Sequence, residues 1–156
     1  MSDAKKSWPD LSGRLDAGAH VLGVRVYYED TDFSGIVYHA SYLRFMERGR
    51  SDLLRLCGVH HSALDAGITG ERLAIVVRHM DIDYLKPAHI DEVLEIRTFC
   101  QHARGAKIIL EQTVERAGEV LIRARVTAAV INREGRARRI PPEVVERLGV
   151  VIASAD

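Results

Sequence analysis

Residues 41–57, Ser-Tyr-Leu-Arg-Phe-Met-Glu-Arg-Gly-Arg-Ser-Asp-Leu-Leu-Arg-Leu-Cys, have the helical period that organises the rest of the chain. At about 100° per residue, small and apolar side chains gather on one face and charged ones on the other. The first face contains Tyr42, Met46, Gly49, Leu53, Leu56 and Cys57, and the second contains Arg44, Arg48, Ser51, Asp52 and Arg55. The pattern predicts a long core-facing helix with Ser41 as its N-cap and Gly58 just beyond its end.

Glycine inside a helix costs about 1 kcal/mol relative to alanine. Because Gly49 lies on the apolar face, we expect another backbone to pass close to it. The segments around the helix have a period of two, which is typical of strands. One precedes the helix and four follow it, at residues 20–28, 73–85, 93–100, 108–114 and 120–131. Tight turns between successive strands favour antiparallel pairing, and the helix must bury its apolar face on the sheet. The sequence therefore predicts an α+β fold in which a curved five-stranded antiparallel sheet wraps round one long central helix.

The chain has 156 residues, which favours a single domain. We expect this domain to span residues 20–150, with residues 1–19 as a flexible N-terminal tail. Lys plus Arg and Asp plus Glu both total 22, so no overall charge favours nucleic acid or an anionic membrane. No apolar run approaches the roughly 18 residues of a membrane span, and no secretory signal is expected. A cytoplasmic protein is expected. Cys57 and Cys100 allow a disulfide, but two cysteines in such a chain are more often buried thiols.

The segment between the first strand and the helix carries the candidate chemistry: Tyr28-Glu29-Asp30-Thr31-Asp32-Phe33-Ser34-Gly35-Ile36-Val37-Tyr38-His39-Ala40. A carboxylate held near the unpaired N–H groups at a helix start could polarise and attack a carbonyl. Asp30 and Asp32 are the candidates, although either could instead fold the loop through an Asx-turn. For His39 taken alone, the residues favour a neutral histidine that serves packing and local hydrogen bonds. Nucleophile-elbow and phosphate-loop motifs are absent, and no metal site is predicted because His60 and His61 lack further ligands at suitable spacing.

The run Tyr28-x-Asp30-Thr31-Asp32-x-x-Gly35-x-Val37-Tyr38-His39-Ala40-x-Tyr42-Leu43-x-Phe45-x-Glu47-Arg48 resembles the signature of the Tol-Pal-associated acyl-CoA thioesterases, close relatives of 4-hydroxybenzoyl-CoA thioesterase. Later segments agree with this resemblance: Val76-Val77-Arg78, Tyr84-x-x-Pro87-Ala88-x-x-Asp91 and Leu94-Glu95-Ile96. The resemblance covers about residues 20–142. It implies a hotdog fold and dimers whose sheets join edge to edge, often paired into tetramers. It also implies an acyl-CoA substrate bound at the subunit interface.

Within this resemblance, the family's essential carboxylate falls on Asp32, and His39 and Tyr28 match positions that line the site. The remaining candidate substrate-binding positions are Gly35, Val37, Tyr38, Ala40, Val77 and Arg78, and Arg104 and Lys107 are candidate contacts for the CoA phosphates. No separate cofactor is expected, since CoA is part of the substrate.

The implied reaction is hydrolysis of a thioester to a carboxylic acid and free CoA. Asp32 either attacks the carbonyl carbon, which gives a mixed anhydride, or activates a water molecule. The N–H groups of His39 and Ala40 would bind the developing oxyanion. Two alternatives stay open: a thioesterase acting on acyl groups carried by acyl carrier protein, and a non-catalytic acyl-CoA binder or envelope-complex partner. The sequence does not choose the acyl group.

Overall fold

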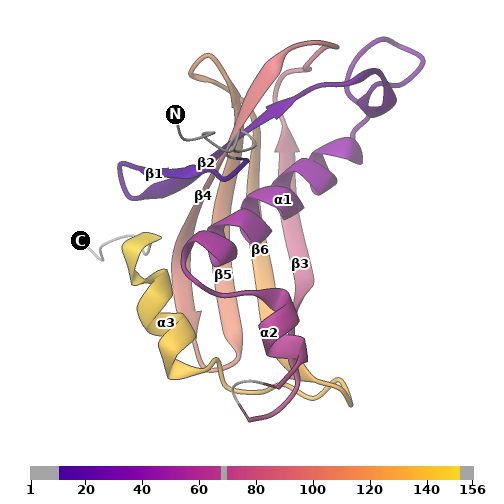
Figure 1. The fold of residues 1–156 in the computed structure, drawn as a ribbon. Helices are drawn as coiled ribbons and strands as arrows, with labels where there is room; N and C mark the ends of the chain where they lie inside the picture. Colours follow the sequence, from indigo (N-terminus) through magenta and orange to yellow (C-terminus); the bar gives the residue numbers. More distant parts are fainter. Residues whose placement is uncertain (1–10, 68–69, 152–156) are drawn as a thin grey trace, which may run out of the picture.

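One antiparallel sheet carries three α-helices on a single face in the computed structural model, which describes residues 11–67 and 70–151 (Figure 1). The strands are β1 (Arg14–Asp16), β2 (Ala19–Arg25), β3 (Leu73–Tyr84), β4 (Val93–Arg104), β5 (Lys107–Arg116) and β6 (Glu119–Asn132). The helices are α1 (Ser41–Leu56), α2 (His61–Asp65) and α3 (Pro142–Leu148), with short 3₁₀ turns at Tyr28–Asp30 and Gly149–Val151.

The strands lie in the order β1-β2-β4-β5-β6-β3, and every neighbouring pair is antiparallel. The predicted α+β fold with an antiparallel sheet is confirmed, but the sheet has six strands rather than five. The additional strand, β1, lies in the segment expected as a tail, and it pairs with β2 through a turn at Ala17 and Gly18. Both turn residues have positive φ, which suits a tight hairpin. The first ten residues of the expected tail lie outside the described residues.

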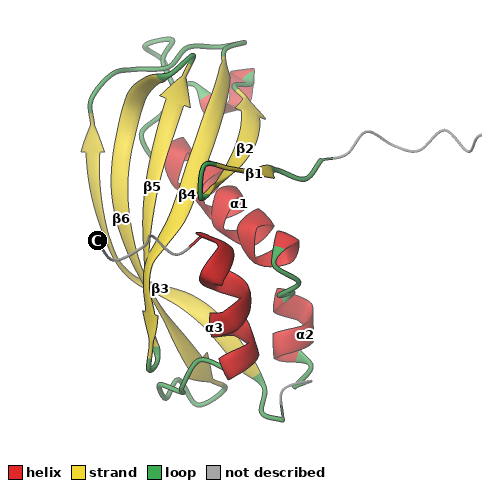
Figure 2. Ribbon diagram, turned by 90° about the vertical axis from the view of Figure 1, so that its left-hand side faces the viewer, coloured by secondary structure: helices red, strands yellow, loops and turns green. Residues whose placement is uncertain are grey.

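Helix α1 does not run the full length of the sheet, as a long central helix would. It has 16 residues, which at the rise of an α-helix give a length of about 24 Å. Strand β6 has 14 residues, which at the rise of a strand give about 46 Å. Helix α1 therefore covers only part of the length of the sheet, and α2 and α3 cover the other end of the same face (Figure 2).

The apolar face of α1 packs close to the sheet at Gly49. A Cβ atom at this position would lie 2.8 Å from Cγ2 of Ile96 in β4, so the helix could not approach as closely with a larger residue. A close neighbour at Gly49 is therefore present, but the nearest atoms belong to side chains of the sheet and not, as predicted, to another backbone. Gly58 has a positive φ and ends the helix: its N–H donates to the carbonyl of Arg55, and the N–H of Val59 donates to that of Leu54. At the other end the N-cap is Ala40, not Ser41, whose hydroxyl donates to the Asp30 carbonyl.

Two predicted face assignments on α1 are wrong. Leu56 is 43% exposed, and Asp52 turns toward the sheet. The Asp52 carboxylate lies 2.6 Å from Nε2 of the buried His20 and accepts a 2.7 Å hydrogen bond from the N–H of Gly13. The helical pattern of the sequence could not predict the partner of Asp52, because only the tertiary fold brings His20 to α1.

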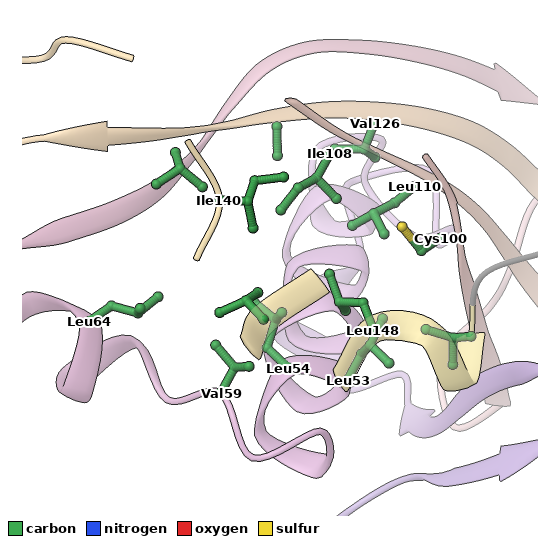
Figure 3. Packing of buried hydrophobic residues seen from close by; sticks show 14 of the residues in the cluster. Leu53, Leu54, Val59, Leu64, Cys100, Ile108, Leu110, Val126, Ile140 and Leu148 are labelled. Carbon is green, nitrogen blue, oxygen red and sulfur yellow. The ribbon is translucent and has the colours of Figure 1, made fainter. Parts of the chain in front are cut away.

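The core has two clusters of buried apolar residues. One lies under the first half of α1, around Tyr42 and Phe45, and the other lies between the second half of α1, α2, α3 and the sheet (Figure 3). Cys100 is a buried free thiol in the second cluster, and burial raises its pKa to about 11. Cys57 is also free. Within the described ranges, no helix is both long and apolar enough to cross a membrane.

Candidate active site

The loop between β2 and α1 is folded by Asp30. Its carboxylate accepts a 2.8 Å hydrogen bond from the N–H of Tyr27, and its backbone carbonyl accepts one of 2.8 Å from the N–H of Tyr38. Isolated bridges join Thr31 to Val37 and residue 36 to residue 89. Of the two candidate carboxylates, Asp30 therefore has a structural role, which leaves Asp32 as the candidate for chemistry.

Asp32 lies at the exposed tip of this loop, where Ser34 holds one of its carboxylate oxygens. Oδ1 accepts a 2.7 Å hydrogen bond from the Ser34 N–H and a second from the Ser34 hydroxyl. This is the Asx-turn geometry considered for Asp32, and Gly35 closes the turn with a positive φ. Oδ2 accepts no hydrogen bond from any described residue. The two bonds from Ser34, with a smaller contribution from His39, lower the pKa of Asp32, so its free oxygen is negatively charged near neutral pH.

Asp32 borders two depressions. The first, of about 410 Å³, lies against the start of α1 and the end of β3, and it is also lined by His39, Tyr42 and Tyr84. The second, of about 530 Å³, is lined by Tyr28 and Gly35 together with Phe33. The structure therefore places the three candidate catalytic residues around one loop, with His39 and Tyr28 in different depressions.

The start of α1 offers two free backbone donors, at His39 and Ala40. Among the described residues, neither the N–H of His39 nor that of Ala40 donates a hydrogen bond, and no side chain caps the helix at its N-cap, Ala40. The positive end of the helix dipole adds to the attraction for negative charge. His39 lines the first depression together with Asp32, whereas Ala40 is not among its lining residues.

Tyr84 is a site residue that the sequence analysis missed, although it belongs to the quoted motif. Its hydroxyl donates a 3.1 Å hydrogen bond to the carbonyl of His39. Its ring packs edge-on against those of His39 and Tyr42, with centroids 6.2 and 5.9 Å apart. The position of Tyr84 at the end of a strand just before Lys86-Pro87 was the available signal.

Two of the other candidates in this loop have different environments. Val37 is buried in the core and its N–H donates to the carbonyl of Ala88, so its contribution is to fix the loop. Tyr38 is exposed, and its ring lies 4.5 Å from that of His39.

Four predicted substrate-binding residues lie away from Asp32 within the chain. Arg78 and Lys107 line a depression of about 690 Å³ on the sheet face opposite the helices, and Arg104 lies opposite Lys107 in the β4–β5 hairpin. Val77 lines a separate cavity between α1 and β3.

The sheet register shows how far these residues lie from the Asp32 site. Lys107 and Val76 lie in register through Ala129. Tyr84, which borders the same depression as Asp32, follows Val76 by roughly 26 Å along β3 at the rise of an extended strand. One chain alone therefore does not unite Arg78, Lys107 and Asp32.

No cluster of three His, Cys, Asp or Glu side chains suited to a metal ion occurs in residues 11–67 and 70–151. Both Arg78 and Lys107 are free of ion pairs with described residues. The chemistry that the arrangement offers is thus an ionised carboxylate in a depression at the start of α1, with separate unpaired cations at the far end of the sheet.

Comparisons with known proteins identify the family of this chain. The family model described as the thioesterase-like superfamily matches residues 26–148. The acyl-CoA thioester hydrolase YbgC of Escherichia coli O6:H1 is 44% identical over 99 residues, which are 64% of this chain and 71% of the relative. The acyl-CoA thioesterase YbgC of Haemophilus influenzae is 40% identical over 109 residues, 70% of this chain and 78% of the relative.

Solved structures give the same result. A probable thioesterase from Bartonella henselae superposes with a TM-score of 0.77 and 47% identity, covering 79% of this chain and 99% of its own. A 4-hydroxybenzoyl-CoA thioesterase variant in complex with 4-hydroxybenzoyl-CoA has a TM-score of 0.76 at 19% identity, covers 85% of this chain and 99% of its own, and shows the shared fold alone. The resemblance to these thioesterases is confirmed, while an association with Tol-Pal stays a prediction. The chain belongs to the thioesterase-like superfamily.

Proposed function

We propose that this protein is an acyl-CoA thioesterase that hydrolyses a thioester to a carboxylic acid and free CoA. The observation that carries the proposal is the free, ionised Oδ2 of Asp32 at a depression that His39 also lines, where α1 begins with the unpaired N–H groups of His39 and Ala40. Relatives named as acyl-CoA thioesterases support CoA over acyl carrier protein as the carrier of the acyl group. A non-catalytic binder would gain nothing from an ionised carboxylate beside the carbonyl.

In the proposed reaction, the carbonyl oxygen lies against the N–H groups of His39 and Ala40. Asp32 Oδ2 then either forms a bond to the carbonyl carbon or accepts a proton from a water molecule that does so. In both routes the C–S bond breaks and the CoA thiolate leaves. In the first route, water then cleaves the mixed anhydride, which restores the carboxylate, and a proton of that water goes to the thiolate. In the second route, the proton that Asp32 accepted passes to the thiolate, which also restores the carboxylate. Loss of one oxyanion donor typically costs about 3–4 kcal/mol, so the two N–H groups could supply a large part of the rate.

A dimer would bring the two separated groups of residues together. Strand β3 lies at one edge of the sheet and offers 12 residues for pairing, whereas β1 at the other edge has three. Antiparallel pairing of two β3 strands about a two-fold axis near their middle would place the partner's Tyr84 end beside this chain's Leu73–Val77 end. This arrangement supports the predicted active site at a subunit interface. The further pairing of dimers into tetramers, and a cytoplasmic location, stay predictions.

The unpaired cations fit the remaining part of the substrate. Arg78 and Lys107 share one depression, and Arg104 lies opposite Lys107 across the hairpin on the same face. Guanidinium and ammonium groups with no carboxylate partner are suited to phosphate oxygens. We infer that these residues hold the phosphates of CoA.

A panel of aliphatic and aromatic acyl-CoA thioesters, assayed for release of free thiol by the purified protein, tests the proposal. Hydrolysis of at least one thioester well above the rate without protein is expected. Tight binding of CoA esters with no thiol release from any of them would contradict the proposal and favour a binding protein.

A further inference from the structure

Arg50 on α1 is a half-buried cation without a carboxylate partner. Its Nη1 donates a 3.0 Å hydrogen bond to Oε1 of the buried Gln112, and this is its sole hydrogen bond within the described part of the chain. Burial lowers the pKa of its guanidinium. Charges withdrawn from water in proteins are normally paired, because removal of a charge from water is costly. Most N–H donors of Arg50 therefore remain available to an acceptor that enters from outside.

The charge of Glu47 opposes the lowering of the Arg50 pKa, but the Glu47 carboxylate does not serve as that acceptor. Glu47 precedes Arg50 by one helical turn, but its Oε1 accepts a 2.7 Å hydrogen bond from the Ser51 hydroxyl. Arg50 forms no ion pair with Glu47 or with any other side chain in residues 11–67 and 70–151. The Ser51 hydroxyl also lies 3.4 Å from Nε2 of His61.

Arg50 lines a cavity of about 120 Å³ between α1 and the sheet. The polar lining residues are Glu47, Arg50, Ser51 and His61, and the walls are apolar. Figure 3 shows the side chains of Leu53, Leu54, Ile108, Leu110 and Leu148, which form much of the wall. Since a water molecule takes up about 30 Å³ in the liquid, the cavity has room for about four non-hydrogen atoms.

The edge strand β3 forms one wall of the cavity. Ile75, Val76 and Val77 of β3 line it, and Val77 is 45% exposed. This is the half of β3 that the proposed pairing places beside the partner's Asp32 end. An acyl group whose carbonyl lies at the partner's carboxylate would therefore extend toward Arg50.

We propose that this cavity binds the far end of a short acyl chain that ends in a carboxylate, with the Arg50 guanidinium as its counter-ion and the apolar walls around its methylene groups. The inference rests on the proposed thioesterase function and names the substrate class for the same site. A bidentate pair between guanidinium and carboxylate would use the donors of Arg50 that are otherwise unpaired.

Succinyl-CoA and butyryl-CoA test the proposal, because their acyl chains have equal carbon number and differ in the terminal carboxylate. After subtraction of the rate without protein, kcat/KM is expected to favour succinyl-CoA by at least about tenfold. Arg50→Gln is expected to lower this ratio by about ten- to a hundredfold, because a charge-assisted hydrogen bond is lost. Arg48→Gln, a matched change at an exposed arginine of the same helix, should leave the ratio unchanged.

Two results would overturn the proposal. One is a wild-type protein that hydrolyses butyryl-CoA as well as or better than succinyl-CoA. The other is an Arg50→Gln variant that loses both activities equally, which would make Arg50 a structural or subunit contact.

If neither thioester is hydrolysed, the proposed function fails, and binding then tests the cavity separately. Calorimetry with the stable thioethers S-(3-carboxypropyl)-CoA and S-butyl-CoA should show tighter binding of the acidic ligand to the wild type and loss of that difference in Arg50→Gln. Equal affinities in the wild type would overturn the inference.

Discussion

The hydroxyl of Tyr84 donates a hydrogen bond to the backbone carbonyl of His39, at 3.1 Å, across 45 residues of sequence. The bond joins the end of the edge strand β3 to the peptide that carries one of the two candidate oxyanion donors, the N–H of Ala40. The peptide between His39 and Ala40 is therefore held from its carbonyl side, and its N–H has no acceptor among the described residues. In this account Tyr84 is a positioning residue.

Tyr84→Phe should lower kcat about fivefold, since a neutral hydrogen bond contributes about 1 kcal/mol. KM should change little, because the substrate keeps its other contacts, and the melting temperature should stay close to that of the wild type. Steady-state kinetics with one acyl-CoA and a thermal melt give both readouts. An unchanged kcat with a lower melting temperature would mean that the bond is structural alone.

Removal of the cations on the outer sheet face should weaken binding of the nucleotide part of the substrate. We expect the double variant Arg78→Ala, Lys107→Ala to raise KM for an acyl-CoA about tenfold or more, because contacts to phosphate are lost. The matching acyl thioester of N-acetylcysteamine lacks the nucleotide and should react equally with both proteins. Equal loss with the two substrates would show that these residues do not contact the phosphates.

The pH profile of kcat/KM should reflect the lowered pKa of Asp32. A carboxylate acting as nucleophile or base is active above its pKa, so the acid limb of the wild-type profile should lie below the ordinary value of 3.8. Ser34→Ala removes the hydroxyl that contributes most to the lowering, and the acid limb should shift to higher pH. Circular dichroism at each pH separates this shift from unfolding. If the acid limb of Ser34→Ala lies at the same pH as that of the wild type, the limb reports a group other than Asp32.

Gly49→Ala tests the contact between α1 and β4. The added methyl group would lie 2.8 Å from Cγ2 of Ile96, and overpacking of this kind costs about 1–3 kcal/mol, against a gain of up to about 1 kcal/mol in helix propensity. Urea denaturation should therefore show net destabilisation.

In the double variant with Ile96→Ala the clash is absent, so the two changes should cost less together than their sum, by about 0.5 kcal/mol or more. Simple additivity would place the strain elsewhere.

The sequence predicts the central features of the fold because they are encoded locally. The apolar face of residues 41–57, with Gly49 in its middle and Gly58 after it, predicted α1 to within one residue at its C-terminal end. Strand β1 was missed because all three of its residues are exposed, so no burial pattern marks it. The inward position of Asp52 depends on the buried His20, which only tertiary structure brings near.

The residues of the candidate site also divide into those that the local sequence predicts and those that depend on tertiary structure. Asp32 and His39 could be predicted together because one loop carries both. Tyr84 could not be assigned from local pattern, since its contact with His39 spans two separate elements. Arg78 and Lys107 lie at the opposite end of the sheet from Asp32, so the role proposed for them requires the proposed dimer.

Replacement of Asp32 tests the central claim most directly. Asp32→Asn keeps the size of the side chain and an oxygen that can accept the bonds from Ser34, but removes the negative charge from the other atom. The neighbouring change Glu29→Gln, in the same loop at an exposed residue, is the matched control. We predict that kcat/KM for a hydrolysed acyl-CoA falls by about a thousandfold or more in Asp32→Asn and stays within about twofold in Glu29→Gln. Near-normal hydrolysis by a folded Asp32→Asn protein would contradict the account.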